Sequence, residues 1–285
     1  MARTPKAAAS PSRSVRLPTA IGLVVAGVIV VGLLGLRHRL LAQAQYADVK
    51  ARVVLASAPR WLWPDVAKRV RDDIQAAAGG RSVFEPELAR DVHAAAAANV
   101  WTARVVGVTK HADGRVVVEA RFRKPYAVVQ TVRNWPVLDR EGVVLPVRLA
   151  RIPANSLVII AGVKSSPPEP GKVWDAPDLA DGLKLRRLIE GRPYVREITC
   201  IDVRNHRRRV SQLDPELVLI AQVARGSRTV IRFGRFPVEG IGDYCVSPAQ
   251  KLQYLDAYYR RNGSRLAGGR DFIELRYDDP YASIR

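Results

Sequence analysis

The sequence predicts an α+β protein with one transmembrane helix, a small β-α-α-β-β domain, and a mixed β-rich domain that ends in a C-terminal helix and a final strand. Three observations support this prediction: an uncharged run at 17–36, alternating helical and β-type periods over 49–132, and short β-rich runs between turn residues over 133–285. A disordered basic tail (1–16) would precede the transmembrane helix, and a juxtamembrane linker (37–48) would follow it.

The predicted transmembrane helix is the run from Leu17 to Leu36, which carries no charged residue. At a rise of about 1.5 Å per residue, such a helix reaches about 30 Å, the thickness of the hydrocarbon core of a bilayer. Arg16 precedes the run, and Arg37 and Arg39 follow it. Basic residues are balanced on the two sides, but a short tail before a large domain favours a cytoplasmic N-terminus. We therefore expect a single-pass protein of the cytoplasmic (inner) membrane with its C-terminal domains exported.

Two other interpretations of the apolar run remain open. Ala42–Ala44 fits the small-x-small pattern of a signal-peptide cleavage site, although the run is longer than a usual signal-peptide core. A buried core helix is the other alternative, and the charged flanks argue against it.

The balance of charge is strongly basic. The chain has 46 Lys and Arg against 27 Asp and Glu, which gives a net charge of +19. Such a surface favours anionic neighbours, among them anionic lipid, wall polymers and acidic protein segments. Nucleic acid is not expected as a partner, because no RNA-binding or helix-turn-helix signature accompanies the charge. The basic run Arg207–Arg209 is either an anion-binding patch or a basic turn between strands.

The segment 49–132 has the pattern of one β-α-α-β-β unit. A short β-rich run at 52–56 is followed by two helical periods, which begin at Trp63-Pro64 and at Pro86-Glu87. Two valine-rich runs then flank Asp113-Gly114, a strong signal for a β-hairpin.

The segment 133–285 contains many short strands. Residues 134–149 predict a hairpin that turns at 139–142. Further strands are expected over 156–163, 198–203, 217–223, 230–233 and 271–277, and helices over 179–190 and from Ser247-Pro248 to Asn262-Gly263.

Motifs for catalysis are absent from the sequence. It has no G-x-S-x-G, Walker, Rossmann or H-E-x-x-H pattern, and the four histidines, His38, His93, His111 and His206, lack the spacing of metal ligands. We expect each histidine to be at the surface or half-buried, and we expect no enzyme activity, no metal and no cofactor. Cys200 and Cys245 are either joined in a disulfide or are two buried free thiols.

Several short patterns, in order, resemble the FtsQ/DivIB division proteins of bacteria over nearly the whole chain. They are Asn99–Val105, Arg123–Ala127, Val137–Leu145, Lys251-Leu252 and Ile273–Asp278. The resemblance implies a POTRA domain at 49–132, an FtsQ-like β-domain at 133–285, no catalysis, and a scaffold role in the divisome at the division septum. It also implies partners of the FtsB and FtsL type, which are small bitopic division proteins.

The family's partner contact adds a strand at the sheet edge near the C-terminus. Arg276 and Tyr277 match the family's last strand, so the resemblance places this contact on them first. The chain departs from the family pattern directly afterwards, at Asp278-Asp279-Pro280. Extra negative charge and a proline there change the chemistry that a partner would meet.

Residues 271–277 also predict a strand on physical grounds, because their side chains alternate between two faces. Phe272, Glu274 and Arg276 share one face, and the partner-binding residues are predicted to be these three and Tyr277. An edge strand would offer free N–H and C=O groups to an incoming strand, whereas an interior strand, or one blocked by Pro280, would not.

Two other functions are compatible with the pattern. One is a POTRA-bearing component of envelope transport or secretion, although multiple POTRA repeats or a large barrel are not apparent. The other is a membrane-tethered protein that binds a polyanion through its positive charge.

Overall fold

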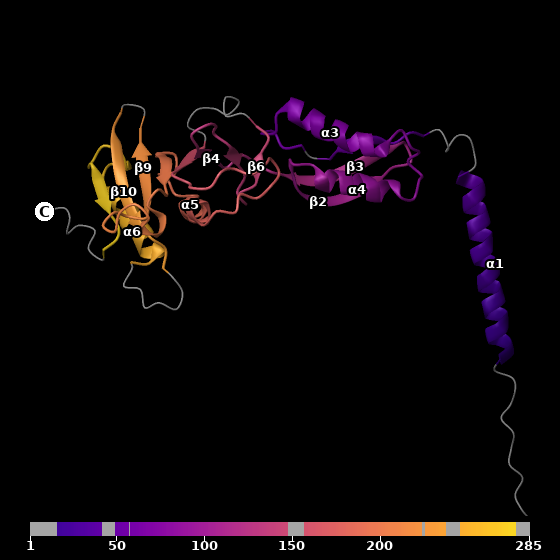
Figure 1. The fold of residues 1–285 in the computed structure, drawn as a ribbon. Coiled ribbons are helices and arrows are strands. Elements are labelled where there is room, and N and C mark those ends of the chain that lie inside the picture. Colours follow the sequence, from indigo (N-terminus) through magenta and orange to yellow (C-terminus); the bar gives the residue numbers. More distant parts are fainter. Residues whose placement is uncertain are drawn as a thin grey trace, which may run out of the picture. The chain divides into compact units, whose positions relative to one another are not determined.

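The fold comes from a computed structural model that describes residues 16–41, 49–56, 58–147, 157–223, 226–237 and 246–277. Over these residues the protein is α+β, with five α-helices and two β-sheets (Figure 1). The predicted tail up to residue 15, most of the predicted linker, Cys245 and the segment from Asp278 onward lie outside the described residues.

The first helix corrects the prediction of a membrane span. Helix α1 covers Arg16–Leu41, but its side chains are described only over residues 22–36. Within the described ranges, no helix has both the length and the apolar character needed to cross a bilayer. The predicted transmembrane helix (17–36) and the predicted single-pass inner-membrane location are therefore wrong.

The chain divides into two compact units. The first takes in described residues within Met1–Ser57, Lys68–Ala96 and Val105–Glu119, and the second those within Ala58–Ala67, Ala97–Arg104 and Ala120–Arg285. Each unit is described separately.

The first sheet has the β-α-α-β-β order that the sequence predicts. Its elements are β1 (Arg52–Leu55), α3 (Pro64–Ala78), α4 (Leu88–Ala98), β2 (Thr102–Lys110) and β3 (Arg115–Phe122). The strands lie in the order β1-β3-β2, and β1 runs parallel to β3. Gly114 turns the β2–β3 hairpin with a φ of +89°, and a Cβ there would lie 2.9 Å from the carbonyl oxygen of Lys50. Only glycine fits this turn without strain.

The outer edge of β1 is covered by other parts of the chain. The Gln75 amide on α3 accepts from the N–H of Val53 at 2.7 Å and donates to the carbonyl of Ala51 at 3.0 Å. The N–H of Ala51 donates to the carbonyl of Arg81. The N–H and C=O groups of Ala51 and the N–H of Val53 are thus already paired, which hinders the addition of another strand at the start of β1.

The second sheet has eight strands in the order β11-β10-β9-β8-β7-β4-β5-β6. Their bounds are β4 (Ala127–Gln130), β5 (Val137–Leu138), β6 (Val144–Leu145), β7 (Val158–Ala161), β8 (Ile198–Asp202), β9 (Leu217–Gln222), β10 (Arg228–Gly234) and β11 (Phe272–Glu274). The β5–β6 hairpin has the predicted turn, in which Gly142 adopts a φ of +85° and its N–H donates to the carbonyl of Asp139. Strand β4 was not predicted from the sequence; it runs parallel to β7 and precedes the predicted domain boundary at 132.

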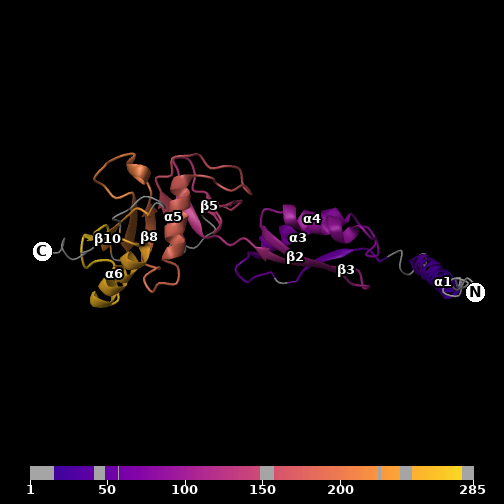
Figure 2. The same ribbon diagram turned by 90° about the horizontal axis from the view of Figure 1, so that it is seen from below.

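Two helices, α5 (Pro177–Leu188) and α6 (Pro248–Arg261), lie on the same face of the second sheet (Figures 1 and 2). Leu252 and Leu255 of α6 join Ile231 and Phe233 of β10 in one hydrophobic core. The predicted start of α6 is confirmed, because the Ser247 hydroxyl accepts from the N–H of Gln250 at 3.2 Å. The helices thus bury this face of the sheet and leave its last strand, β11, at one end.

Candidate functional site

Strand β11 lies at the end of the second sheet, beside β10 (the yellow strand next to β10 in Figure 1). The pairing is parallel, and it joins the carbonyl of Asp271 to the N–H of Val230 and the N–H of Leu275 to the carbonyl of Arg232. Main-chain groups of alternate residues point to opposite sides of a strand. The N–H and C=O groups of Phe272 and Glu274 therefore point away from β10, where the described part of the chain has no further strand.

The other end of the second sheet is closed. The N–H of Val144 in β6 donates to the carbonyl of Lys172 at 3.0 Å, and its carbonyl accepts from the N–H of Gly171 at 2.8 Å. In the first sheet β1 is covered as well, whereas β2 is a second edge with no strand beside it among the described residues. Exposed aromatic side chains distinguish the β11 edge from β2: Phe272 on β11 is 38% exposed, and Tyr277, which follows β11, is 61% exposed.

The four predicted partner-binding residues come together at this edge, but they have different surroundings. Phe272 lies under the guanidinium of Arg232, 4.4 Å from the ring centre to Cζ. Glu274 is buried, which differs from the simple alternation of exposed and buried faces that the sequence suggests. The reason is electrostatic: Arg276 donates to both Glu274 carboxylate oxygens at 2.8 Å, and Arg232 lies 3.6 Å away.

Arg276 links the edge to a neighbouring loop. Its hydrogen bonds with Glu274 raise the pKa of the guanidinium, which stays fully charged, and its Nη1 donates to the carbonyl of Leu213 at 2.7 Å. The Leu213 side chain is 84% exposed, and Val210 in the same loop is also exposed. Arg276 is thus used to hold the edge in place, while Tyr277, Phe272 and Leu213 offer apolar surface around it.

Of the two cysteines, Cys200 is the one that lies within the described part of the chain. Cys200 lies on β8 with no disulfide partner among the described residues, and burial raises the pKa of its thiol to about 11. Cys245 lies outside the described residues. The alternative of a disulfide between them stays a prediction.

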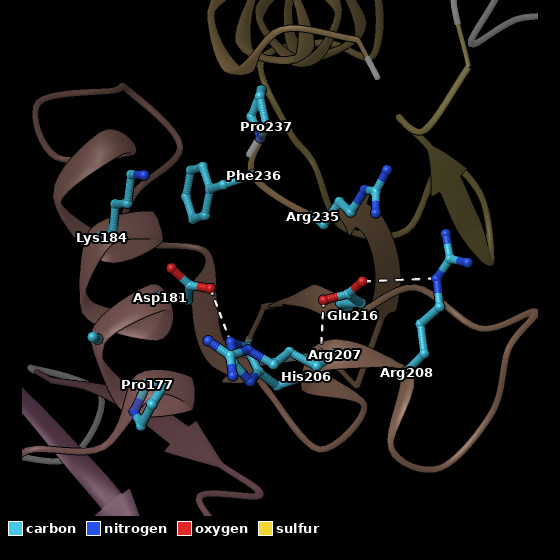
Figure 3. Close-up of a pocket in the computed structure, with 11 residues that line it drawn as sticks. Pro177, Asp181, Lys184, His206, Arg207, Arg208, Glu216, Arg235, Phe236 and Pro237 are labelled. Carbon is cyan, nitrogen blue, oxygen red and sulfur yellow. Dashed lines mark hydrogen bonds and ion pairs between the residues drawn. The ribbon is translucent and has the colours of Figure 1, made fainter. Parts of the chain in front are cut away.

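A basic cavity is the second feature of this unit, with a volume of about 640 Å³ (Figure 3). It lies between α5, the short turn His206–Arg208, the residue before β9 and the segment that follows β10. Its lining residues are Pro177, Ala180, Asp181, Lys184, His206, Arg207, Arg208, Glu216, Arg235, Phe236 and Pro237.

The two carboxylates of the cavity are held by the turn at 206–208, as the dashed lines in Figure 3 show. Asp181 lies 3.0 Å from Nε2 of His206, which is buried rather than at the surface or half-buried as predicted. Glu216 accepts from the N–H of Arg207 at 2.8 Å and lies 3.8 Å from Nε of Arg208. The carboxylates therefore hold the backbone of the turn and the His206 ring in place.

The basic run Arg207–Arg209 divides into two roles. Arg207 and Arg208 both adopt a φ of +56°, a left-handed conformation that costs about 1–2 kcal/mol for each non-glycine residue. Both side chains line the cavity. Arg209 turns inward instead, and donates to Asp178 at 2.7 Å and to the carbonyls of Gly162, Val203 and Arg204.

Hydrogen bonds from a neighbouring side chain stabilise the left-handed turn at His206–Arg208. The Asn205 amide donates to the carbonyls of Ser211 and Asp214 and accepts from the N–H groups of Val210 and Ser211. Backbone strain that the surroundings enforce is common at functional sites. The described residues contain no group of three or more His, Cys, Asp or Glu side chains that could hold a metal ion.

The comparisons with known proteins add no support to the resemblance to the FtsQ/DivIB proteins, which is based on short sequence patterns alone. No family model matches the chain, and no curated protein sequence matches it significantly.

Proposed function

We propose that this protein is an interaction scaffold of the bacterial cell-division machinery, which recruits partners of the FtsB and FtsL type by adding a partner strand to the outer edge of β11. The resemblance of the sequence to the FtsQ/DivIB proteins supplies the division role and the partner class. The observation that supports the mode of binding is the edge position of β11, with the main-chain groups of Phe272 and Glu274 pointing outward.

The surroundings of the edge also support strand addition. An incoming strand gains main-chain hydrogen bonds from the edge and side-chain specificity from its flanks. Tyr277 and Phe272 supply aromatic surface, the residue type that is enriched at protein interfaces. The ion pair of Arg276 with Glu274 keeps the edge rigid, which lowers the entropic cost of binding.

Two substitutions of Phe272 distinguish the effect of losing a main-chain hydrogen bond from the effect of losing the side chain. Phe272→Pro removes an outward N–H without touching the bonds to β10, whereas Phe272→Ala keeps it. With the FtsB- and FtsL-type proteins of the same genome, we expect Phe272→Pro to weaken binding by more than about tenfold, or about 1.4 kcal/mol, relative to Phe272→Ala. Isothermal titration calorimetry measures both dissociation constants.

Tyr277→Lys provides a second, independent variant, because Tyr277 is exposed and its replacement leaves the core intact. Deletion of residues 271–285 is less informative, since it also removes the buried Ile273 and Leu275. Unchanged affinity in both Phe272→Pro and Tyr277→Lys, with each variant folded by circular dichroism, would exclude this edge as the binding site.

A further inference from the structure

The basic cavity under α5 is not used by strand addition at β11, and its chemistry is that of a ligand site. Four cationic side chains reach it from three segments: Lys184 from α5, Arg207 and Arg208 from the turn, and Arg235 from the end of β10. The carboxylates Asp181 and Glu216 are the acidic members of the lining, so four lysine and arginine side chains face two carboxylates.

The contacts inside the cavity show which of its cationic side chains can bind an anion. Asp181 is engaged by His206, and the shortest contact of Glu216 is with the main-chain N–H of Arg207 rather than with a guanidinium. Arg208 approaches Glu216 only to 3.8 Å. The guanidinium of Arg207 and most donors of Arg208 therefore remain for an anion, and arginine forks suit the paired oxygens of phosphate.

The cavity also has an apolar side. Phe236 and Pro237 form one wall, Pro177 and Ala180 contribute from α5, and Lys184 lies 4.3 Å above the Phe236 ring. A volume of about 640 Å³ is within the range of pockets for small organic molecules. It is far larger than a lone inorganic anion requires, so an uncharged part of a ligand can lie against Phe236.

We propose that this cavity binds an organic phosphate monoester, with the phosphate held by the basic side chains of the turn and the organic part against Phe236. A phosphate monoester carries close to two negative charges at neutral pH, which balances the excess charge of the lining. The strained turn fits this role, because its left-handed backbone places two consecutive arginines in the lining of one cavity, on opposite sides of Glu216 (Figure 3). The site is independent of the strand-addition function and does not require it.

The experiment uses the full chain and phenyl phosphate as the probe, in phosphate-free buffer at low salt, by isothermal titration calorimetry. The test variant is Arg207→Gly with Arg208→Gly, because glycine accepts the left-handed conformation and relieves its strain. The matched control, Arg260→Gln with Arg204→Gln, removes the same net charge from exposed residues outside the cavity lining.

We expect saturable binding by the wild-type chain and by the control, and binding at least about tenfold weaker in the glycine variant, which unfolds at the same or a higher denaturant concentration. Tighter binding of phenyl phosphate than of inorganic phosphate is expected from the apolar wall. Equal loss of affinity in the control, or no saturable binding by the wild type, would overturn the proposal.

Two further probes identify the source of the phosphate group. Glycerol 3-phosphate represents a soluble metabolite, and short-chain phosphatidic acid represents a lipid headgroup. Binding of either probe with the same dependence on Arg207 and Arg208 supports the proposal and names the source. Binding of both probes with no dependence on these arginines contradicts it.

Discussion

Glu274→Ala is expected to destabilise the second unit by about 3–5 kcal/mol, because it breaks a buried ion pair by removing one partner. The variant leaves the Arg276 guanidinium without the two carboxylate oxygens that it binds at 2.8 Å, and it removes the acceptor for the N–H of Arg276 at 3.2 Å. Arg232 loses its nearby carboxylate as well. Chemical denaturation followed by the fluorescence of Trp174, which is buried in this unit, measures the loss.

A matched control and a rescue make this prediction specific. Glu190→Ala breaks an exposed ion pair with Arg140 and should cost less than about 1 kcal/mol. Adding Arg276→Met to Glu274→Ala removes the uncompensated charge and should recover part of the stability, since an apolar pair can replace a buried ion pair. Strictly additive losses in this double-mutant cycle would contradict the coupling that the structure assigns to the pair.

The burial of Glu274 illustrates which features of this fold can be predicted from sequence patterns and which cannot. Features that depend on residues close together in the sequence were predicted correctly, such as the Ser247 cap of α6 and the turn at Asp139–Gly142. Alternation along 271–277 predicted a strand but not its burial, because two arginines, one of them on β10, neutralise Glu274 and draw it inside. Strand β4 was missed, since a run of four residues carries little local signal until β7 pairs with it.

The basic cavity could be predicted only in part, for a similar reason. The run Arg207–Arg209 was visible in the sequence, but Lys184, Glu216 and Phe236 reach the cavity from separate segments that only the tertiary fold brings together. The inward role of Arg209 has no local signal at all. The sequence predicted a membrane span from the uncharged run 17–36, but no helix in the described part of the chain has both the length and the apolar character to cross a bilayer.

Arg209→Met is the second substitution with a large expected effect, a loss of about 3–5 kcal/mol at neutral pH. The buried carboxylate of Asp178 would lose its only guanidinium contact among those described, at 2.7 Å, and the carbonyls of Val203 and Arg204 would lose a donor. Arg204→Met is the matched control, because the Arg204 side chain is exposed and pairs with Asp202 at the surface; its cost should stay below about 1 kcal/mol.

The pH dependence of this variant distinguishes loss of the ion pair from loss of packing. Burial alone would raise the pKa of Asp178, but hydrogen bonds from Arg209 and from the N–H groups of Lys164 and Leu179 together lower it below its ordinary value. A lowered pKa means that the carboxylate stabilises the fold above its unfolded pKa of about 3.9, and that this contribution is lost as the pH falls through the lower folded pKa.

The difference in unfolding free energy between the wild type and Arg209→Met should therefore be largest at neutral pH and become smaller as Asp178 is protonated. Part of the difference should persist in acid, because the bonds of Arg209 to the main-chain carbonyls do not depend on the charge of Asp178. Urea titrations from pH 7 to about pH 3 measure both parts. A difference that stays constant over this range would mean that Arg209 acts through packing and its carbonyl bonds alone, and that its contact with Asp178 contributes no stability.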